Sequence, residues 1–287
     1  MTNNTKGLLI TSIGVLIMSL ESLFIKLTTI SPFSFSFYIG IFMFFSMIGT
    51  LFIKQRDNLK DIFKISFPIL LLCATLMGVS NILFISAIKS TTVANVVIIF
   101  ATSALFSALF AYLFYKQKVG KNIYYASFFM FFGLFIIFND DLEVGGLKGN
   151  IFALICTIAF SISFVLLAKY KEINRVALMA FSGLILSFIS FFLAKDINID
   201  LHNLIIVSIM GLLITPISRV LLGNGTKYIN ASEVSLLMII ETIMAPIWVW
   251  IFLKEIPSSN TFIGGSIILL TLILNSLYTM SKAKNIL

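Results

Sequence analysis

Charged residues are scarce in this sequence. Asp, Glu, Lys and Arg make up 11% of its 287 residues, and 59% of the residues are hydrophobic. Soluble domains carry about 25% charged residues, so too few are present here to cover a water-exposed surface. The composition therefore excludes a soluble enzyme or binding domain. It predicts an all-α integral membrane protein that has the lipid bilayer as its main partner.

Histidine and cysteine are also rare. The one histidine, His202, is expected in a loop, and Cys73 and Cys156 each lie inside an apolar run. A disulfide framework, a metal site or a nucleophile activated by a neighbouring base needs more of these residues. We therefore expect no metal, no cofactor and no catalytic site, which leaves a membrane-embedded lipid-modifying enzyme as the weakest of the alternatives.

Long apolar runs are what the sequence has in abundance. A bilayer core about 30 Å thick needs ~20 apolar residues per helix. Ten runs of about this length, with short connections, predict ten transmembrane helices, and they leave no room for a soluble domain. The predicted spans are residues 8–29, 33–53, 66–88, 92–114, 122–138, 149–168, 176–194, 204–226, 231–253 and 260–280.

The basic residues are distributed unevenly between the predicted loops. If the N-terminus is cytoplasmic, 14 of the 20 Lys and Arg residues lie on the cytoplasmic side, 5 lie outside and Arg219 lies within a span. Cytoplasmic loops carry such an excess of Lys and Arg. The net charge of +8 is thus explained without a nucleic-acid partner. The pattern fits ten spans with both termini in the cytoplasm, and we expect the protein in a bacterial inner membrane.

A loop rich in acids and glycines, NDDLEVGGLKG, separates two apolar blocks of five spans each. It divides the chain into a first half (1–138), an extracytoplasmic linker (139–148) and a second half (149–287). Because each half has an odd number of spans, a duplicated second half would be inserted upside down. The chain is therefore expected to be an inverted repeat of two five-helix units.

An offset of 138 residues aligns the two halves without gaps over several elements. It places residues 112–117 (YLFYKQ) over residues 250–255 (WIFLKE), and Lys89, Lys116 and Asn122 meet identical residues. In so apolar a chain some identities are chance matches, and the alignment of whole elements carries more weight.

The chain resembles the EamA-type transporters of the drug/metabolite transporter superfamily over almost its whole length. The most specific segment runs from 231 to 265, and its matching residues are Ala231, Ser232, Pro246 and the sequence Leu253-Lys254-Glu255. In the first half Ala108 stands where Pro246 would match, and Gln117 replaces the acid that matches Glu255. Lys26 is similar to a basic residue often found near the end of the first span. The resemblance implies transport of small molecules, commonly export, and leaves the substrate open.

Charged residues inside the spans are the main candidates for a functional site. An ionisable group at the bilayer centre costs at least ~2.5 kcal/mol, so it is expected to face the protein interior or a wet cavity. Glu241 lies near the middle of the ninth predicted span, Arg219 lies in the eighth and Glu21 in the first. Glu233, nearer a span end, is expected to be an interfacial acid favoured by the helix dipole.

Arg219 and Glu241 have two interpretations. They are either an ion pair that holds two neighbouring helices together, or residues of a cavity in which Arg219 binds a carboxylate or phosphate of the substrate. Glu21 has no expected partner at its depth, which suits an acid that takes up and releases a proton. Lys26 is expected to extend toward the outer interface.

Further polar and aromatic residues are candidates by their position. Pro246 is expected to bend the ninth span one turn beyond Glu241. Trp248 shares the face of Glu241 and is expected either to stack a substrate or to pack in the bundle. In the alignment of the halves, Asn81 matches Arg219 and Ser103 matches Glu241, so these neutral groups would line the same cavity.

These observations favour a secondary transporter over other classes. We expect it to export a small polar metabolite or an amino-acid-like compound by alternating access, and protons are a candidate coupling ion. A non-transporting membrane receptor or assembly protein is the second hypothesis, and the charges within the spans argue against it.

Overall fold

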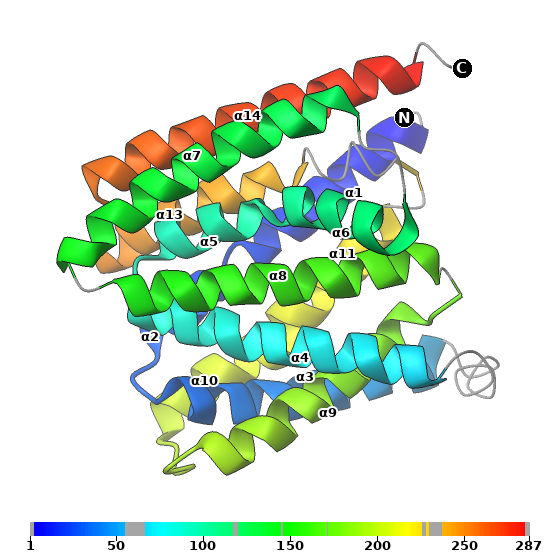
Figure 1. Ribbon diagram of the computed structural model, residues 1–287. Coiled ribbons are helices and arrows are strands. Elements are labelled where there is room, and N and C mark those ends of the chain that lie inside the picture. The colour runs from blue at the N-terminus through cyan, green and yellow to red at the C-terminus, as the bar shows by residue number, and fades with distance from the viewer. Residues whose placement is uncertain are drawn as a thin grey trace.

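Parallel and antiparallel helices pack into one bundle (Figure 1). The computed structural model describes residues 3–54, 67–116, 120–144, 146–170, 172–225, 228–229 and 237–284. Within these ranges all regular secondary structure is helical. The protein is therefore all-helical over the part of the chain that the structure describes, as the composition predicts.

The helices follow one another with short connections. In chain order they are α1 (Asn3–Met18), α2 (Glu21–Leu27), α3 (Pro32–Lys54), α4 (Phe67–Ser90), α5 (Val93–Ala101), α6 (Ser103–Tyr115), α7 (Lys121–Val144), α8 (Leu147–Lys169), α9 (Arg175–Leu193), α10 (Leu201–Ile209), the π-helical turn η2 (Met210–Ile214), α11 (Thr215–Gly225), α13 (Ile239–Leu253) and α14 (Ser259–Lys284).

Nine segments in the described ranges are long and apolar enough to cross a bilayer. They correspond to nine of the ten predicted spans. For the remaining prediction, 231–253, the structure describes α13, which has 15 residues, while residues 231–236 lie outside the described part. Glu233 and Gln117 also lie outside it. α13 continues through Pro246, and a bend there stays a prediction.

Three predicted spans are interrupted rather than continuous. A turn at Ser19 and Leu20 separates α1 from α2, Thr102 separates α5 from α6, and η2 lies between α10 and α11. At the first two breaks a hydroxyl turns back onto the preceding turn: Ser19 donates to the carbonyl of Leu16 at 2.7 Å, and Thr102 to that of Ile99 at 2.6 Å. Such bonds offer the backbone an alternative to the regular helix.

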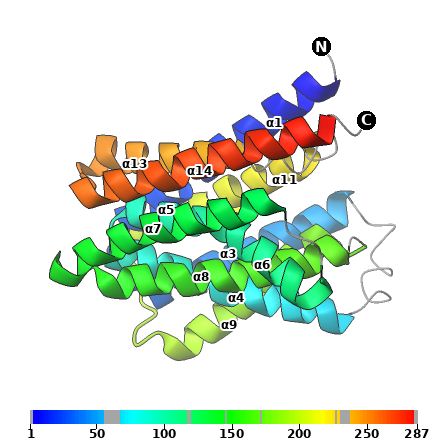
Figure 2. The same ribbon diagram turned by 45° about the horizontal axis from the view of Figure 1, so that its top comes forward.

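The two ends of the bundle can be told apart by the course of the chain. α1 begins and α14 ends at the same end, which we call the terminal end (Figure 1, Figure 2). The opposite end, where α2 ends, is called the distal end. Because successive spans alternate in direction, α4 and α13 also end at the distal end, and α5 begins there.

Each of the main helix contacts joins one helix of the first half to one of the second. α1 packs against α11, α3 against α9, α4 against α8, α5 against α13, and α7 against α14. α7 and α14 lie side by side in both views (Figure 1, Figure 2). The first seven residues of α5 are all buried, so α5 lies in the core, and α13 packs against it with one face, which carries Ala245 and Val249.

Candidate functional site

Arg219 on α11 and Glu21 at the start of α2 form an ion pair inside the bundle. Nη2 of Arg219 lies 3.4 Å from Oε2 of Glu21, and the two side chains are 29% and 12% exposed. Nη1 of Arg219 also contacts the sulfur of Met18 at 2.8 Å. The expectation that Glu21 lacks a partner is therefore wrong. It considered only Lys26 on the same span, whereas the partner comes from α11, which packs against α1.

Glu241 completes a group of three charges. It lies in the first turn of α13, is half-buried, and interacts electrostatically with both Arg219 and Glu21. Within the described residues it forms no ion pair and no hydrogen bond through its carboxylate. Glu21 Oε1 is buried and likewise accepts no hydrogen bond from the described residues. With all three groups ionised, the cluster of Glu21, Arg219 and Glu241 carries one net negative charge and has free acceptors.

Trp248 lies to one side of this cluster. Its indole Nε1 donates a hydrogen bond to the Ser19 hydroxyl at 2.9 Å, and Ser19 is part of the turn between α1 and α2. Trp248 therefore joins α13 to the turn that positions Glu21. We call Glu21, Arg219, Glu241 and Trp248 the central cluster.

Asn81 and Ser103 lie on other helices, and no described contact joins them to the central cluster. Asn81 is half-buried on α4, and Ser103 is the first residue of α6. The carbonyl of Ser103 accepts a hydrogen bond from Ser161 of α8 at 3.1 Å. Their role in a common cavity stays a prediction.

A cavity of about 550 Å³ lies between the terminal-end halves of α6 and α8. Ala108 and Ala111 line one side, and Phe164 and Lys169 line the other. The ammonium of Lys169 lies 4.3 Å from the ring centre of Tyr115 at its rim. The sequence analysis missed this cavity because small residues on a helix are common and give no signal by themselves.

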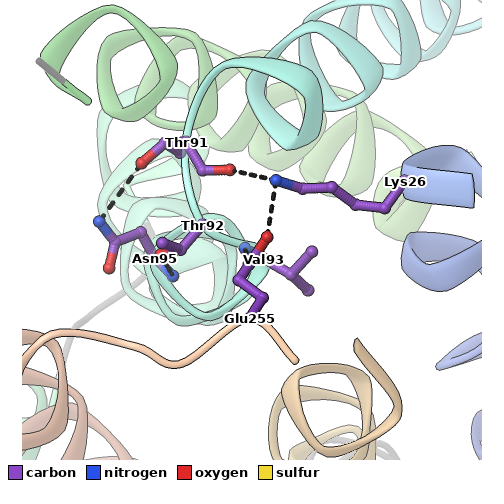
Figure 3. A network of polar contacts seen from close by, with 6 residues as sticks. All are labelled: Lys26, Thr91, Thr92, Val93, Asn95 and Glu255. Atoms are coloured by element: carbon purple, nitrogen blue, oxygen red, sulfur yellow. Dashed lines mark hydrogen bonds and ion pairs between the residues drawn. The ribbon is translucent and has the colours of Figure 1, made fainter. Parts of the chain in front are cut away.

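A second polar group lies at the distal end of the bundle (Figure 3). Nζ of Lys26 lies 2.8 Å from Oε2 of Glu255 and donates to the carbonyl of Thr91 at 2.9 Å. Oε1 of Glu255 accepts the backbone N–H of Val93, the first residue of α5, at 2.7 Å. Glu255 thus joins α2 to α5. Extension of Lys26 toward the outer interface stays a prediction.

Lys89 at the end of α4 adds a second ammonium group nearby. It donates to the hydroxyl of Thr28 at 2.8 Å and also to the Thr28 carbonyl. Lys26 and Lys89 are close enough to repel each other. We call Lys26, Lys89, Glu255 and the N–H of Val93 the distal cluster.

The long apolar helices, with charges held between them, define a multi-pass membrane protein. The chain belongs to the EamA-like transporter family, whose model matches residues 5–139 and 147–277. The resemblance seen in the sequence is thereby confirmed.

Individual relatives carry names of the same kind. An "Uncharacterized transporter" of Clostridium kluyveri is 26% identical over 238 residues, which are 75% of this chain and 73% of the relative. The "Uncharacterized transporter YdfC" of Bacillus subtilis is 28% identical over 185 residues, or 62% of this chain and 60% of its own length. A crystal structure of a further protein matches 96% of this chain and 98% of its own with a TM-score of 0.67 at 14% identity, so the fold is shared.

Proposed function

We propose that this protein is a secondary carrier that exports a small polar metabolite or an amino-acid-like compound by alternating access. The central cluster carries the proposal, because charges held at this depth in apolar helices are costly and mark transport paths. The carrier is proposed to lie in a bacterial inner membrane with both termini in the cytoplasm, as the distribution of basic residues favours.

Contacts across the bundle support an inverted repeat of two five-helix units. If the first to fifth spans correspond to the sixth to tenth, the contact of α1 with α11 is equivalent to that of α4 with α8. Three further contacts each join a span of the first half to its own equivalent in the second half: α3 with α9, α5 with α13, and α7 with α14. Lys116 and Lys254, aligned at the offset of 138, both end a helix with positive φ, 55° and 58°.

The chemistry of the central cluster suits a cargo with an amino group. Two carboxylates face one guanidinium, so a proton or a substrate ammonium group would balance the charge. The Arg219–Glu21 distance of 3.4 Å exceeds the about 2.7–2.9 Å typical of a strong charge-assisted bond. A cargo carboxylate could replace Glu21 on Arg219 at small cost, while its amino group binds Glu241.

Flux in liposomes reconstituted with the purified protein tests this function. Amino acids and other small polar metabolites are offered with and without an imposed proton gradient. Loss of a bond to a charged group costs about 1.5–3 kcal/mol, so we expect Glu21→Gln and Glu241→Gln to slow flux by at least about tenfold and to alter its pH dependence.

Glu172→Gln is the matched control, because Glu172 is exposed in the turn before α9. Unchanged flux and pH dependence in both central variants would remove the proposed proton link. Absence of flux for every compound would favour a non-transporting receptor.

A further inference from the structure

We propose that the distal cluster is a binding site for a carboxylate group of the cargo, and that Glu255 occupies this site while the distal end is closed. The proposal rests on the transport function proposed above and extends it to a second site. It assigns Glu255 the role of an internal ligand that the cargo replaces on its way out.

The distal cluster contains two ammonium groups, Lys26 and Lys89, but only one carboxylate, Glu255. The ammonium groups of Lys26 and Lys89 lie near each other, and Lys89 has no carboxylate partner among the described residues, only the two oxygen atoms of Thr28. Side chains of Lys26 and Glu255 are 21% and 22% exposed, so water screens this charge only in part. One net positive charge remains at a half-buried place, which favours a further anion.

The position of the Glu255 carboxylate shows how such an anion would be held. Its two oxygens bind different partners, Oε2 the Lys26 ammonium at 2.8 Å and Oε1 the Val93 N–H at 2.7 Å (Figure 3). Any carboxylate placed there would find the same two donors. The hydroxyl of Thr92 already caps α5 by accepting the N–H of Asn95 at 3.3 Å, so the Val93 N–H is left for this carboxylate.

Glu255 lies on an irregular segment, whose movement would carry its carboxylate away from the site. α13 ends at Leu253, Lys254 follows in the left-handed region with φ 58°, and Glu255 belongs to the irregular connection that leads to α14. Leaving the site requires rotation of this connection only, not the unwinding of a helix. Lys26 and Val93, by contrast, are fixed in α2 and α5.

Together with the central cluster, this arrangement gives a path for a zwitterionic cargo. With all their groups ionised, the central cluster has one net negative charge and the distal cluster one net positive charge. A carboxylate that leaves Arg219 would next meet Lys26 and Lys89. Displacement of Glu255 would then free the contact between α2, α5 and the α13–α14 connection, and the distal end would open.

Chemical rescue tests the site without requiring transport. Glu255→Ala removes a group of the size of acetate and leaves the donors in place. Val93→Cys supplies a reporter thiol, because Val93 is fully buried at the distal end and the substitution keeps its backbone N–H. Labelling of this reporter thiol by a polar maleimide then measures opening of the distal end in purified protein. Parent protein with its two buried cysteines, Cys73 and Cys156, gives the background.

In the Val93→Cys background, we expect Glu255→Ala to speed labelling of the reporter thiol by about tenfold, because an ion pair and a bond to a charged group are lost. Sodium acetate should slow it again, whereas sodium chloride and methylammonium chloride at equal ionic strength should not. Asp196→Ala, at an acid of the same end outside the cluster, should leave labelling unchanged.

Rescue should disappear when Lys26→Met is added to Glu255→Ala. Equal slowing by acetate with and without Lys26, or no slowing at all, would overturn the proposal. Rescue by inorganic phosphate but not by acetate would overturn it in favour of a phosphate site. None of these outcomes depends on flux, so failure here is distinguishable from failure of the proposed transport function.

Discussion

Arg219 is bound to Glu21 and interacts with Glu241, so it compensates two acids within the bundle. Replacement by Met would leave both acids without a counter-charge. Such a loss costs 0–1 kcal/mol for exposed pairs and about 3–5 kcal/mol for buried ones, and this half-buried pair at long distance should lie between them, at about 2 kcal/mol. Thermal unfolding in detergent should show a lower Tm for Arg219→Met. A Tm equal to that of the parent would mean that the pair has no structural role.

Exchanging the two charges separates a structural pair from a binding site. The double variant Glu21→Arg, Arg219→Glu restores one positive and one negative group at the same places. We expect its Tm to recover most of the loss seen in Arg219→Met, because the pair can form again. Flux should stay lost, because a cargo would meet each charge in the wrong place. Recovery of both Tm and flux would show that the pair only holds the helices together.

The charged residues of the central cluster were found from the sequence, but their partners were not. Glu21, Arg219 and Glu241 stand out because charge is so rare in these runs. Glu21 and Arg219, however, are 198 residues apart, and only the packing of α1 on α11 brings them together. The same holds for Lys26 and Glu255, because their contact depends on α2 and α13 ending close together. The rarity of charged residues in apolar runs identifies candidate site residues from the sequence. Which of them form ion pairs depends on how the helices pack.

At the scale of the helix, close backbone approach between α3 and α9 depends on glycine. A Cβ atom at Gly40 would lie 2.6 Å from the carbonyl oxygen of Gly183 and 2.7 Å from the nitrogen of Ser187. Backbone atoms cannot yield as a flexible side chain can, so Gly40→Ala should cost about 1–3 kcal/mol. The Tm of the purified protein measures this loss.

Gly49, in the same helix, is the matched control. A Cβ atom there would meet nothing within 4 Å, and alanine favours a helix over glycine by up to about 1 kcal/mol. Gly49→Ala should therefore raise the Tm slightly while Gly40→Ala lowers it. Equal effects of the two substitutions would contradict the observed approach of α3 and α9.

The N-terminus of α10 gives a pH-dependent prediction outside the membrane-spanning segments. Hydrogen bonds from the Asn203 side chain and backbone hold the pKa of the Asp200 carboxyl below its ordinary value. Because the folded pKa is the lower one, the stabilisation is complete above the unfolded pKa of about 3.9 and is lost as the pH falls through the folded pKa. Asp200→Ala should thus lower the Tm at pH 7, and its difference from the parent should shrink below about pH 4. Asn198→Ala, in the same connection, should show no such convergence.

The sequence placed nine spans close to their observed bounds, but it did not predict the breaks within them. Span position follows from hydropathy, which is a local property. The breaks at Ser19 and Thr102 contain neither glycine nor proline, and their hydroxyl bonds to the preceding turn are also possible in a continuous helix. Glu21 is the first residue after the first of these breaks, and its partner Arg219 comes from α11.

At the scale of the whole molecule, the helix pairs that cross between the halves bring the residues of both clusters together. α5 lies in the core with α13 packed against it, and the central cluster lies where Glu241 near the start of α13 and Glu21 at the start of α2 meet Arg219 of α11. The distal cluster lies at the other end of α13. α13 thus contributes a residue near its start, Glu241, to the central cluster and is followed directly by the connection that carries Glu255 of the distal cluster.

The orientation of the bundle in the membrane is the last prediction, and it follows from the charges at the two ends. If the excess of Lys and Arg faces the cytoplasm, the distal end faces outward. Asn198 is exposed in the connection before α10 at the distal end, and Ser281 is exposed near the end of α14 at the terminal end. A membrane-impermeant maleimide should label Asn198→Cys in intact cells and Ser281→Cys only after the membrane is permeabilised. The reverse pattern would place Lys26, Lys89 and Glu255 on the cytoplasmic side. The distal cluster would then act at the entry of the exported cargo instead of its exit.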